Sequence, residues 1–92
     1  MSLIHLTIVT PQGKPFDADA QRVLVRTTGG EVSILPKHID YAAALGKGEA
    51  RVTQEDGSVR RAEIEGGILH VASDQVQVIT HHFRWKDDEQ EG

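Results

Sequence analysis

The five histidine residues of this sequence are its best candidates for metal or acid–base chemistry. His81 and His82 are adjacent, and neighbouring residues of a strand point to opposite faces, so the two rings cannot easily bind one ion. His5 and His70 take outward-facing positions in alternating stretches, and the sequence has no His-x-His pair of the kind that builds a cupin metal site. We therefore predict no metal centre and interpret the histidines as surface or packing residues.

Neither a nucleophile nor a phosphate loop is evident elsewhere in the sequence. The serines lack the glycine-flanked elbow that exposes an activated hydroxyl group. Asp17 and Asp19 could form a carboxylate pair, but this spacing is common, and we interpret them as part of a solvated turn. Gly29-Gly30 and Gly66-Gly67 are not followed by the Lys-Ser or Lys-Thr and the helix of a phosphate loop. We predict no catalytic residue and no cofactor, and we interpret both glycine pairs as turns or bulges.

Residues 28–38, Thr-Gly-Gly-Glu-Val-Ser-Ile-Leu-Pro-Lys-His, favour a different kind of chemistry. A tight glycine turn precedes a short apolar strand, which a proline ends. Four polar side chains surround that strand, namely Glu31, Lys37, His38 and Asp40. Such a loop presents polar groups at the edge of a domain, which suits recognition of another protein. From the residues alone, protein binding and plain solvation are equally open.

Length and composition limit the classes of function. The 92 residues suffice for one domain. Ten basic and fourteen acidic residues give a net charge of −4, so the basic footprint needed for nucleic-acid binding is not evident. No apolar run approaches the roughly 18 residues that cross a bilayer, and we expect no signal peptide. The absence of cysteine removes thiolate chemistry and mildly favours a reducing compartment.

Short runs of period-two alternation, separated by Gly, Pro and Asp, dominate the sequence and predict strands and turns. Ile4, Leu6 and Ile8 share one phase of the first run, so we expect them to face a core. Residues 41–45 are the only helix-friendly patch, long enough for a connector of about a turn and a half. We predict an all-β fold, an antiparallel β-sandwich or flattened barrel of about eight to ten short strands without a long helix.

The alternation fades near residue 80. We therefore expect a domain over residues 1–80 and a short polar, acidic tail over residues 81–92. Within the domain, we expect a second strand to begin at Phe16 and a separate third strand over residues 23–25. Two alternatives are open for residues 83–85, which either fold back on the sandwich or contact a partner.

Four stretches of the sequence resemble the epsilon chain of rotary, F-type ATP synthases in residues and in order. The resemblance covers nearly the whole of residues 3–80 and concerns the N-terminal β-sandwich domain of that family. Each stretch alone is weakly specific, and their common order and spacing carry the resemblance. The matching residues are Leu6-Thr7-Ile8-Val9-Thr10-Pro11 with Gly13 and Phe16, then Thr28-Gly29-Gly30-Glu31-Val32-Ser33-Ile34-Leu35-Pro36-Lys37-His38, then Leu45 and Gly48, then Gly66-Gly67-Ile68-Leu69 with Val71, Asp74, Val76 and Val78.

The resemblance implies a non-catalytic subunit of the central stalk. In this family the sandwich docks the gamma subunit to the polar loops of the membrane c-ring and so couples ion flow to ATP synthesis. The catalytic alpha and beta subunits would be indirect partners, and no nucleic-acid partner or cofactor is implied. The resemblance further implies a bacterial protein, peripheral to the cytoplasmic face of the inner (plasma) membrane through the complex.

The resemblance also implies which residues contact partners. Glu31 and His38 fall in the family's rotor-facing loop, with Glu31 the better candidate for the c-ring. Thr10 and Ala43 correspond to positions near gamma and the ring, and Lys37 lies in the same loop as His38. An apolar patch could be supplied in part by Val32, Ile34, Leu35, Ile39 and Tyr41.

Two departures from the family pattern affect these expectations. Asp40 stands where the family usually has a proline, which leaves the bend of the following connector open. The family's C-terminal helical hairpin, which in some members inhibits ATP hydrolysis and binds ATP, does not fit into residues 81–92. We therefore expect coupling without hairpin-type inhibition. A free-standing β-sandwich adaptor and a small cupin-type enzyme are the alternative interpretations.

Overall fold

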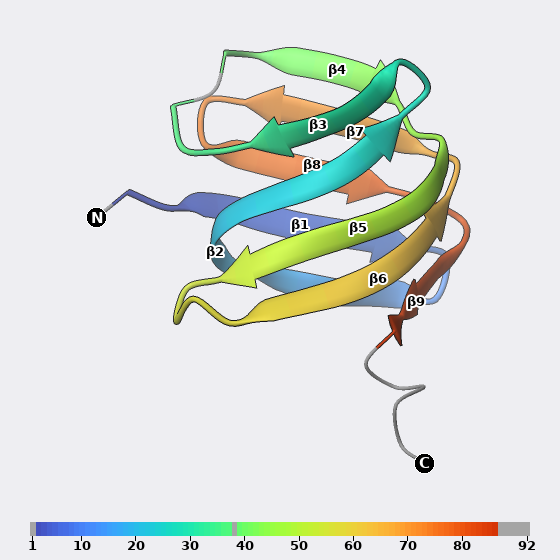
Figure 1. Ribbon diagram of the computed structural model, residues 1–92, viewed down its shortest axis with the longest axis horizontal. Helices are drawn as coiled ribbons and strands as arrows, with labels where there is room; N and C mark the ends of the chain where they lie inside the picture. The colour runs from blue at the N-terminus through green and yellow to red at the C-terminus, as the bar shows by residue number, and fades with distance from the viewer. Residues whose placement is uncertain (1, 38, 87–92) are drawn as a thin grey trace.

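The computed structural model describes residues 2–37 and 39–86, and Figure 1 shows their course. These residues form strands joined by turns and loops, with no α-helix in the part of the chain that is described. The all-β prediction is therefore confirmed. The strands are β1 (Ile4–Thr10), β2 (Gly13–Thr27), β3 (Gly30–Ile34), β4 (Tyr41–Ala44), β5 (Lys47–Gln54), β6 (Val59–Glu65), β7 (Ile68–Ala72), β8 (Gln75–Ile79) and β9 (Phe83–Trp85).

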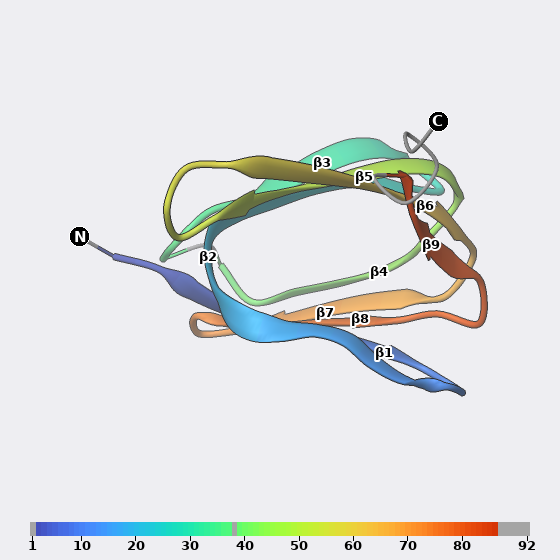
Figure 2. The ribbon, with the colours of Figure 1, turned by 90° about the horizontal axis from the view of Figure 1, so that it is seen from below.

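The strands form two facing layers, seen edge-on in Figure 2. Layer one consists of β4, β7, β8, β1 and residues 13–20 of β2, and layer two of residues 22–27 of β2 with β3, β5, β6 and β9. The strand β2 therefore belongs to both layers, and a register shift between Ala20 and Arg22 marks its passage from one to the other. All pairs are antiparallel except β1 with β8. This arrangement is the predicted β-sandwich.

The hydrophobic core lies between the layers and follows the alternation of the sequence. Ile4, Leu6 and Ile8 are fully buried, as predicted, because every second residue of a strand faces the same side. Thr80 is also buried, and its hydroxyl group donates a hydrogen bond to the carbonyl of Gly66 at 2.7 Å. The rest of the core consists of Phe16, Ala20, Val23, Val25, Ile34, Leu45, Ala50, Val52, Ile64, Leu69, Val71, Val76 and Val78.

The predicted helical connector over residues 41–45 is wrong. Tyr41–Ala44 form the edge strand β4, in which Tyr41 pairs with Val71 and Ala43 with Leu69 of β7. Alanine is the strongest helix former, but helix propensity is small compared with tertiary interactions, and here the pairing with β7 and the packing of Tyr41 against the core override it. An edge strand, rather than a helix, therefore carries Ala43.

The expectation of separate second and third strands is also wrong, because both are parts of the single strand β2. The polar stretch between them, which includes Asp17 and Asp19, lies within β2 and not in a solvated turn. A strand that changes layers exposes different faces along its length, so its alternation weakens without the strand ending.

The sheet continues beyond residue 80. Phe83–Trp85 form β9, which pairs with β6, so the segment folds back on the sandwich. The rings of Phe83 and Trp85 pack edge-to-face at 4.9 Å, and Trp85 also meets Phe16 of β2 at 6.1 Å. These contacts attach layer two to layer one beside residues 13–20. The acidic part of the expected tail, residues 87–92, lies outside the described residues.

One end of the sandwich, here called the turn end, contains the turns at residues 10–13, 27–30, 45–47 and 65–68. Backbone hydrogen bonds connect these turns: Thr28 N–H donates to Ala44 O at 3.0 Å, Leu45 N–H to Gly67 O at 2.9 Å, and Thr80 N–H to Val9 O at 3.0 Å. Gly67 has a φ of 122°, and a Cβ atom there would lie 2.1 Å from the carbonyl oxygen of Ile79. Only glycine therefore fits at this crossing between layers.

The opposite end, here called the loop end, contains residues 35–37 and 39–40, the β5–β6 hairpin and the β7–β8 turn. The backbone N–H of Lys37 donates to the Asp74 carboxylate at 2.7 Å, and the N–H of Ser73 donates to the Asp40 carboxylate at 3.0 Å. Two side-chain carboxylates therefore fasten the loop between β3 and β4 to the β7–β8 turn.

Candidate functional site

Thr10 and Glu31 both lie at the turn end of the sandwich. The Thr10 hydroxyl group accepts a hydrogen bond from Gln12 N–H at 3.2 Å and donates one to Gly13 O at 3.3 Å, which orders the β1–β2 turn. Thr10 also lines a hollow of about 490 Å³ that reaches Phe83 and Trp85. Glu31 is exposed near the start of β3, opposite Arg26 of β2. These two predicted positions share an end of the molecule.

Lys37 lies away from Glu31, although the two are close in sequence. The extended strand β3 carries the chain about 10 Å from Glu31 to Ile34, at about 3.3 Å per residue. Lys37 then follows at the loop end, with a φ of 66° and an exposed side chain. His38, the remaining loop residue of the predicted set, lies outside the described residues.

Ala43 lies in the edge strand β4, on the side that faces the core. It pairs with the buried residue Leu69, whereas its neighbour Ala42 is exposed on the outer face. A larger side chain at Ala43 would therefore press on the core as well as change the surface. The structure thus places Thr10 and Glu31 at one end, Ala43 on an edge strand and Lys37 at the other end.

The apolar patch expected around β3 is not formed as a unit. Ile34 is fully buried, and Val32 and Tyr41 pack against the core. Leu35 and Ile39 alone of that group are exposed among the described residues, Ile39 to 76%. The alternation of β3 explains the difference, because Val32 and Ile34 share the inward phase of the strand.

A different apolar surface crosses the outer face of layer one. Ala44 pairs with Ile68, Ile68 with Ile79, and Ile79 with Val9, so four aliphatic side chains form one line across β4, β7, β8 and β1. This line, here called the apolar row, lies beside the turn end. Ile68 is 54% exposed and Ile79 44% exposed. The sequence analysis missed the row because its members come from four strands and meet only through the register.

The apolar row begins and ends next to predicted contact residues. Ala44 follows Ala43, and Val9 precedes Thr10. The next line across the same strands is polar, with Ala42, His70, Gln77 and Thr7. The apolar surface is therefore confined to the part of layer one nearest the turn end.

The farthest line of layer one contains a small charged cluster. The two ring nitrogens of His5 lie 2.8 Å from the Asp17 carboxylate and 2.9 Å from the Asp19 carboxylate. Both contacts require a proton on the imidazole nitrogen, so they favour the imidazolium form. The hydrogen bonds to Asp19 and Asp17 raise the pKa of His5, and His5 lowers the pKa of Asp17. The cluster joins β1 to β2.

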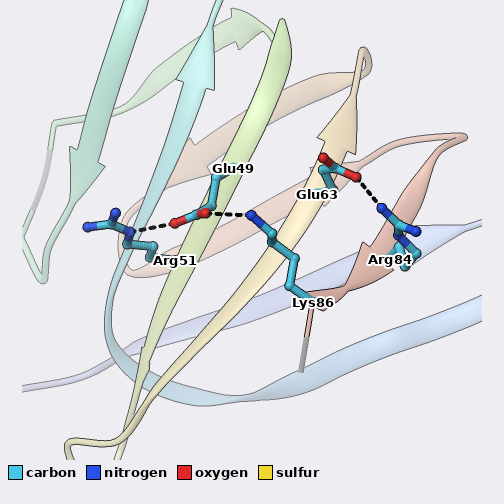
Figure 3. A network of polar contacts seen from close by, with 5 residues as sticks. All are labelled: Glu49, Arg51, Glu63, Arg84 and Lys86. Atoms are coloured by element: carbon cyan, nitrogen blue, oxygen red, sulfur yellow. Dashed lines mark hydrogen bonds and ion pairs between the residues drawn. The ribbon is translucent and has the colours of Figure 1, made fainter. Parts of the chain in front are cut away.

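Ion pairs cover part of the outer face of layer two, as Figure 3 shows. The Glu49 carboxylate accepts hydrogen bonds from Arg51 Nε at 2.7 Å and from Lys86 Nζ at 2.9 Å, while Arg84 pairs with Glu63. The Arg51 contact, followed by that of Lys86, lowers the pKa of Glu49 to about 2. The network connects β5, β6 and β9. The alternation of charges in Glu49-Ala50-Arg51 was its only signal in the sequence.

Chemistry of other kinds finds little support in the described residues. They contain no group of three or more histidine, cysteine, aspartate or glutamate side chains placed to hold a metal ion. Within the same part of the chain, no helix has the length and hydrophobicity to cross a bilayer. The outer faces and the turn end are the candidate contact surfaces among the described residues.

Comparison with known proteins supports the same interpretation. Residues 3–86 match the family model described as the β-sandwich domain of the ATP synthase delta/epsilon chain. The chain is 42% identical over 79 residues to a protein named ATP synthase epsilon chain from Alkalihalophilus pseudofirmus. It is 35% identical over 87 residues to a protein of the same name from Exiguobacterium sp..

The alignments cover more of this chain than of its relatives. They include 86% of this chain and 59% of the Alkalihalophilus protein, and 95% and 64% for the Exiguobacterium protein. The chain therefore spans about six-tenths of the length of these relatives.

Two solved structures share the fold. A chain of the Euglena gracilis mitochondrial ATP synthase, in a structure of OSCP, F1 and c-ring, superposes with a TM-score of 0.89 at 23% identity, over 96% of this chain and 56% of that one. A chain from the Tetrahymena thermophila mitochondrial ATP synthase central stalk and c-ring gives 0.77 at 15% identity, over 95% and 69%.

Proposed function

Because this chain belongs to the family of ATP synthase delta/epsilon chain β-sandwich domains, we propose that it is the rotor subunit that docks gamma to the membrane c-ring. The match over residues 3–86, with relatives named ATP synthase epsilon chain, is the observation that carries this proposal. Such a subunit is non-catalytic, and its role is mechanical. By holding the ring to gamma, it would help ion flow through the ring to drive ATP synthesis.

The apolar row is the proposed contact with gamma. Its four aliphatic side chains lie on a flat outer face and include two isoleucines that are each about half exposed. The fully buried core of a typical interface is more apolar than the surrounding surface, and a few central residues supply most of the binding energy. The row also connects the neighbours of Ala43 and Thr10, the positions that the family resemblance relates to gamma and the ring.

The turn end is the proposed contact with the polar loops of the c-ring. Thr10 and Glu31 both lie there, and the backbone hydrogen bonds between the turns hold this end rigid. Glu31 would set the register of the contact more than its affinity, because exposed charges at an interface act mainly on specificity and association rate. Lys37, at the loop end, is left out of this contact.

This assignment has consequences for location and regulation. The subunit would be peripheral to the membrane, at its cytoplasmic face, and would meet the catalytic alpha and beta subunits only through the complex. The proposed coupling uses the contacts of the sandwich over residues 3–86 and assigns no nucleotide to them. ATP hydrolysis by the complex should therefore change little when residues 1–92 are added, and strong inhibition would contradict the proposal.

Co-purification of the 92-residue chain with gamma from the same cell, followed by mass spectrometry, tests the function and the surface separately. We expect gamma, the c-ring and the catalytic subunits to be recovered together. The double variant Ile68→Asp, Ile79→Asp should reduce recovery of gamma at least about tenfold, which corresponds to about 1.4 kcal/mol. The matched control His70→Asp, Gln77→Asp adds the same charges to the neighbouring polar line and should bind as the parent does.

Two outcomes would contradict different parts of the proposal. If the parent chain recovered none of these subunits, the function itself would be wrong, and the free-standing adaptor would become the better interpretation. If both double variants recovered gamma as well as the parent, the function would stand and the apolar row would be the wrong surface.

A further inference from the structure

A groove of about 390 Å³ crosses the outer face of layer two at its centre. Three strands line it with alternate residues that point away from the core, since the residues between them, such as Val23 and Val52, are buried. We call it the arginine groove, because three of its side chains are arginines. Its lining residues are Arg22 and Leu24 of β2, Arg51 and Thr53 of β5, and Val59 and Arg61 of β6.

The arginines of this groove are arranged unfavourably for the isolated chain. Arg51 and Arg61 pair directly across β5 and β6, and like charges in directly opposed positions destabilise a sheet. Arg22 pairs with Thr53, two residues from Arg51, so the backbone positions of Arg22 and Arg51 lie on a diagonal about 7–8 Å apart. Folding alone does not favour three cations at these positions.

Among the described residues, ion pairs compensate one of the three charges. Arg51 bonds to Glu49 at 2.7 Å. Arg22 and Arg61 have no ion pair with any residue in the part of the chain that the structure describes. An external group with negative charge would offset this repulsion and supply the missing hydrogen-bond acceptors.

We propose that the arginine groove binds an extended, acidic segment of a partner protein, with carboxylates on alternate residues that all point towards the groove. Alternate residues of an extended segment are about 6.6 Å apart, similar to the diagonal spacing of the arginines. Leu24 and Val59 occupy two opposite corners of the groove, and Val59 is 52% exposed. The groove thus offers both cations and apolar contact.

The surroundings of the groove favour a peptide over a nucleic acid or a lipid surface. Glu31, Glu49, Glu63 and Glu65 lie at outward positions of the same layer, and the chain as a whole has a net charge of −4. A continuous row of phosphates would meet these carboxylates, whereas a short segment can place its acidic residues over the arginines alone. Arginine also pairs with carboxylates through two parallel hydrogen bonds.

This site is separate from the surfaces proposed for gamma and the c-ring. The apolar row lies on the outer face of the other layer, and Thr10 lies at the turn end, whereas Val59 and Thr53 lie toward the β5–β6 hairpin. The inference therefore goes beyond the proposed function and can hold or fail independently of it.

Binding of a defined peptide to the full 92-residue chain tests the proposal. The probe is a short, end-blocked synthetic peptide of alternating glutamate and valine residues, and its counterpart carries lysine in place of glutamate. Amide NMR spectra should shift at Leu24, Arg51 and Thr53 on addition of the acidic peptide, and should not shift at Ile68 and Ile79. The lysine peptide should leave the groove unchanged.

Charge-reversed variants distinguish the groove from general electrostatic attraction. Arg22→Glu and Arg61→Glu should each weaken binding of the acidic peptide at least about tenfold. Both side chains are exposed, so we expect both variants to fold. Lys14→Glu makes the same change in net charge at an exposed position of the other layer, and it should weaken binding less than about twofold.

Three results would overturn the proposal. Shifts that spread over the surface without a maximum at the groove would indicate nonspecific attraction, as would an equal loss in Lys14→Glu. Absence of any shift at saturating peptide would exclude the ligand class. Tighter, groove-dependent binding of phosphatidylglycerol vesicles or of a thymidine oligonucleotide would assign the groove to a lipid surface or a nucleic acid instead.

Discussion

The two outer faces of the sandwich present opposite chemistry. The outward positions of β1, β4, β7 and β8 carry no lysine or arginine, and their apolar row is bordered by neutral and His–Asp lines. Of the ten lysine and arginine residues, all but Lys14 and Lys37 lie in layer two or directly after β9. Two faces that share one core thus differ in the chemistry of their outward side chains.

The contrast shows how a domain this small can serve two contacts. The core requires only the inward phase of each strand, which leaves the outward phase free to vary. On layer one the outward phase gives a flat apolar line, and on layer two it gives cations in a groove. An aliphatic surface and an acidic segment are the occupants that these two faces fit.

A substitution at Gly67, where the chain passes from β6 in layer two to β7 in layer one, should have the largest effect on stability. In Gly67→Ala, the new Cβ atom would lie 2.1 Å from Ile79 O, at a φ of 122° that side chains rarely adopt. We expect a loss of at least about 3 kcal/mol in the free energy of unfolding, measured by urea denaturation. Both faces should then be lost together.

Gly66→Ala is the matched control, because a Cβ atom there meets nothing within 4 Å and the φ of 77° is less restrictive. It should cost about 1–2 kcal/mol. Equal losses in the two variants would show that backbone strain, and not the close approach to Ile79, sets the requirement for glycine.

The ion-pair network of layer two should give the next largest effect. The pKa of Glu49 falls from 4.5 to about 2, so its stabilisation is complete above pH 4.5 and is lost as the pH falls towards 2. Glu49→Gln should lower the free energy of unfolding at neutral pH by about 1 kcal/mol, after allowance for solvent screening. It should also flatten the pH dependence between 4.5 and 2, measured by denaturation at a series of pH values.

Glu65→Gln, at an exposed position of β6 on the same face, controls for the loss of one carboxylate. If its profile matched that of Glu49→Gln in this range, the network around Glu49 would not be the source of the stability.

A substitution in the arginine groove of layer two should stabilise the free chain. Arg61→Glu replaces a like-charge pair with an opposite-charge pair across β5 and β6, and it should raise the free energy of unfolding by about 0.2–1 kcal/mol. Arg26→Glu should act in the opposite direction by a similar amount, because Arg26 faces Glu31. Thermal denaturation of both variants gives the sign of the change in stability. A destabilised Arg61→Glu would show that the arginines do not repel one another in the free chain.

The smallest effect should come from the His5 cluster of layer one. The pKa of His5 is raised above 6.5, so the stabilisation is complete below that pH and is lost as the pH rises through the higher, folded-state pKa. His5→Gln should remove this loss of stability with rising pH. The melting temperature of the variant should then change less than that of the parent between mildly acidic and mildly alkaline buffer. His70→Gln, an exposed position on the same face, should keep the parent profile. Parallel curves for parent and His5→Gln would contradict the assignment.

Local patterns in the sequence were sufficient for the core and the fold class. Ile4, Leu6 and Ile8 alternate in one run, so their burial follows from the period of a strand. The glycine pair at residues 66–67 also takes positive φ, as a turn or bulge requires. The prediction for residues 41–45 was wrong because three consecutive alanines carry no strand signal in the sequence. Residues 41–44 form a strand because they pair with β7.

The candidate surfaces depended on contacts that no local pattern contains. Glu31 and Lys37 are near in sequence, yet β3 separates them to opposite ends. Ile68 and Val9 are far apart in sequence, yet the register places both in the apolar row. The arginine groove depends in the same way on three strands. Sequence identifies the residues available for the surface, and strand register decides which of them meet.

The parallel pairing of β1 with β8 has a consequence for the newly made chain. His5 pairs with Gln75 and Val9 with Ile79, so the first strand completes its hydrogen bonds only after most of the domain has been synthesised. Sheets that depend on such distant pairs fold slowly, in milliseconds to seconds. The entropy cost of ordering a long loop arises before the stabilising contacts form. Until β8 leaves the ribosome, one edge of β1 stays open to other strands, and a chaperone that covers this edge would raise the yield of native protein.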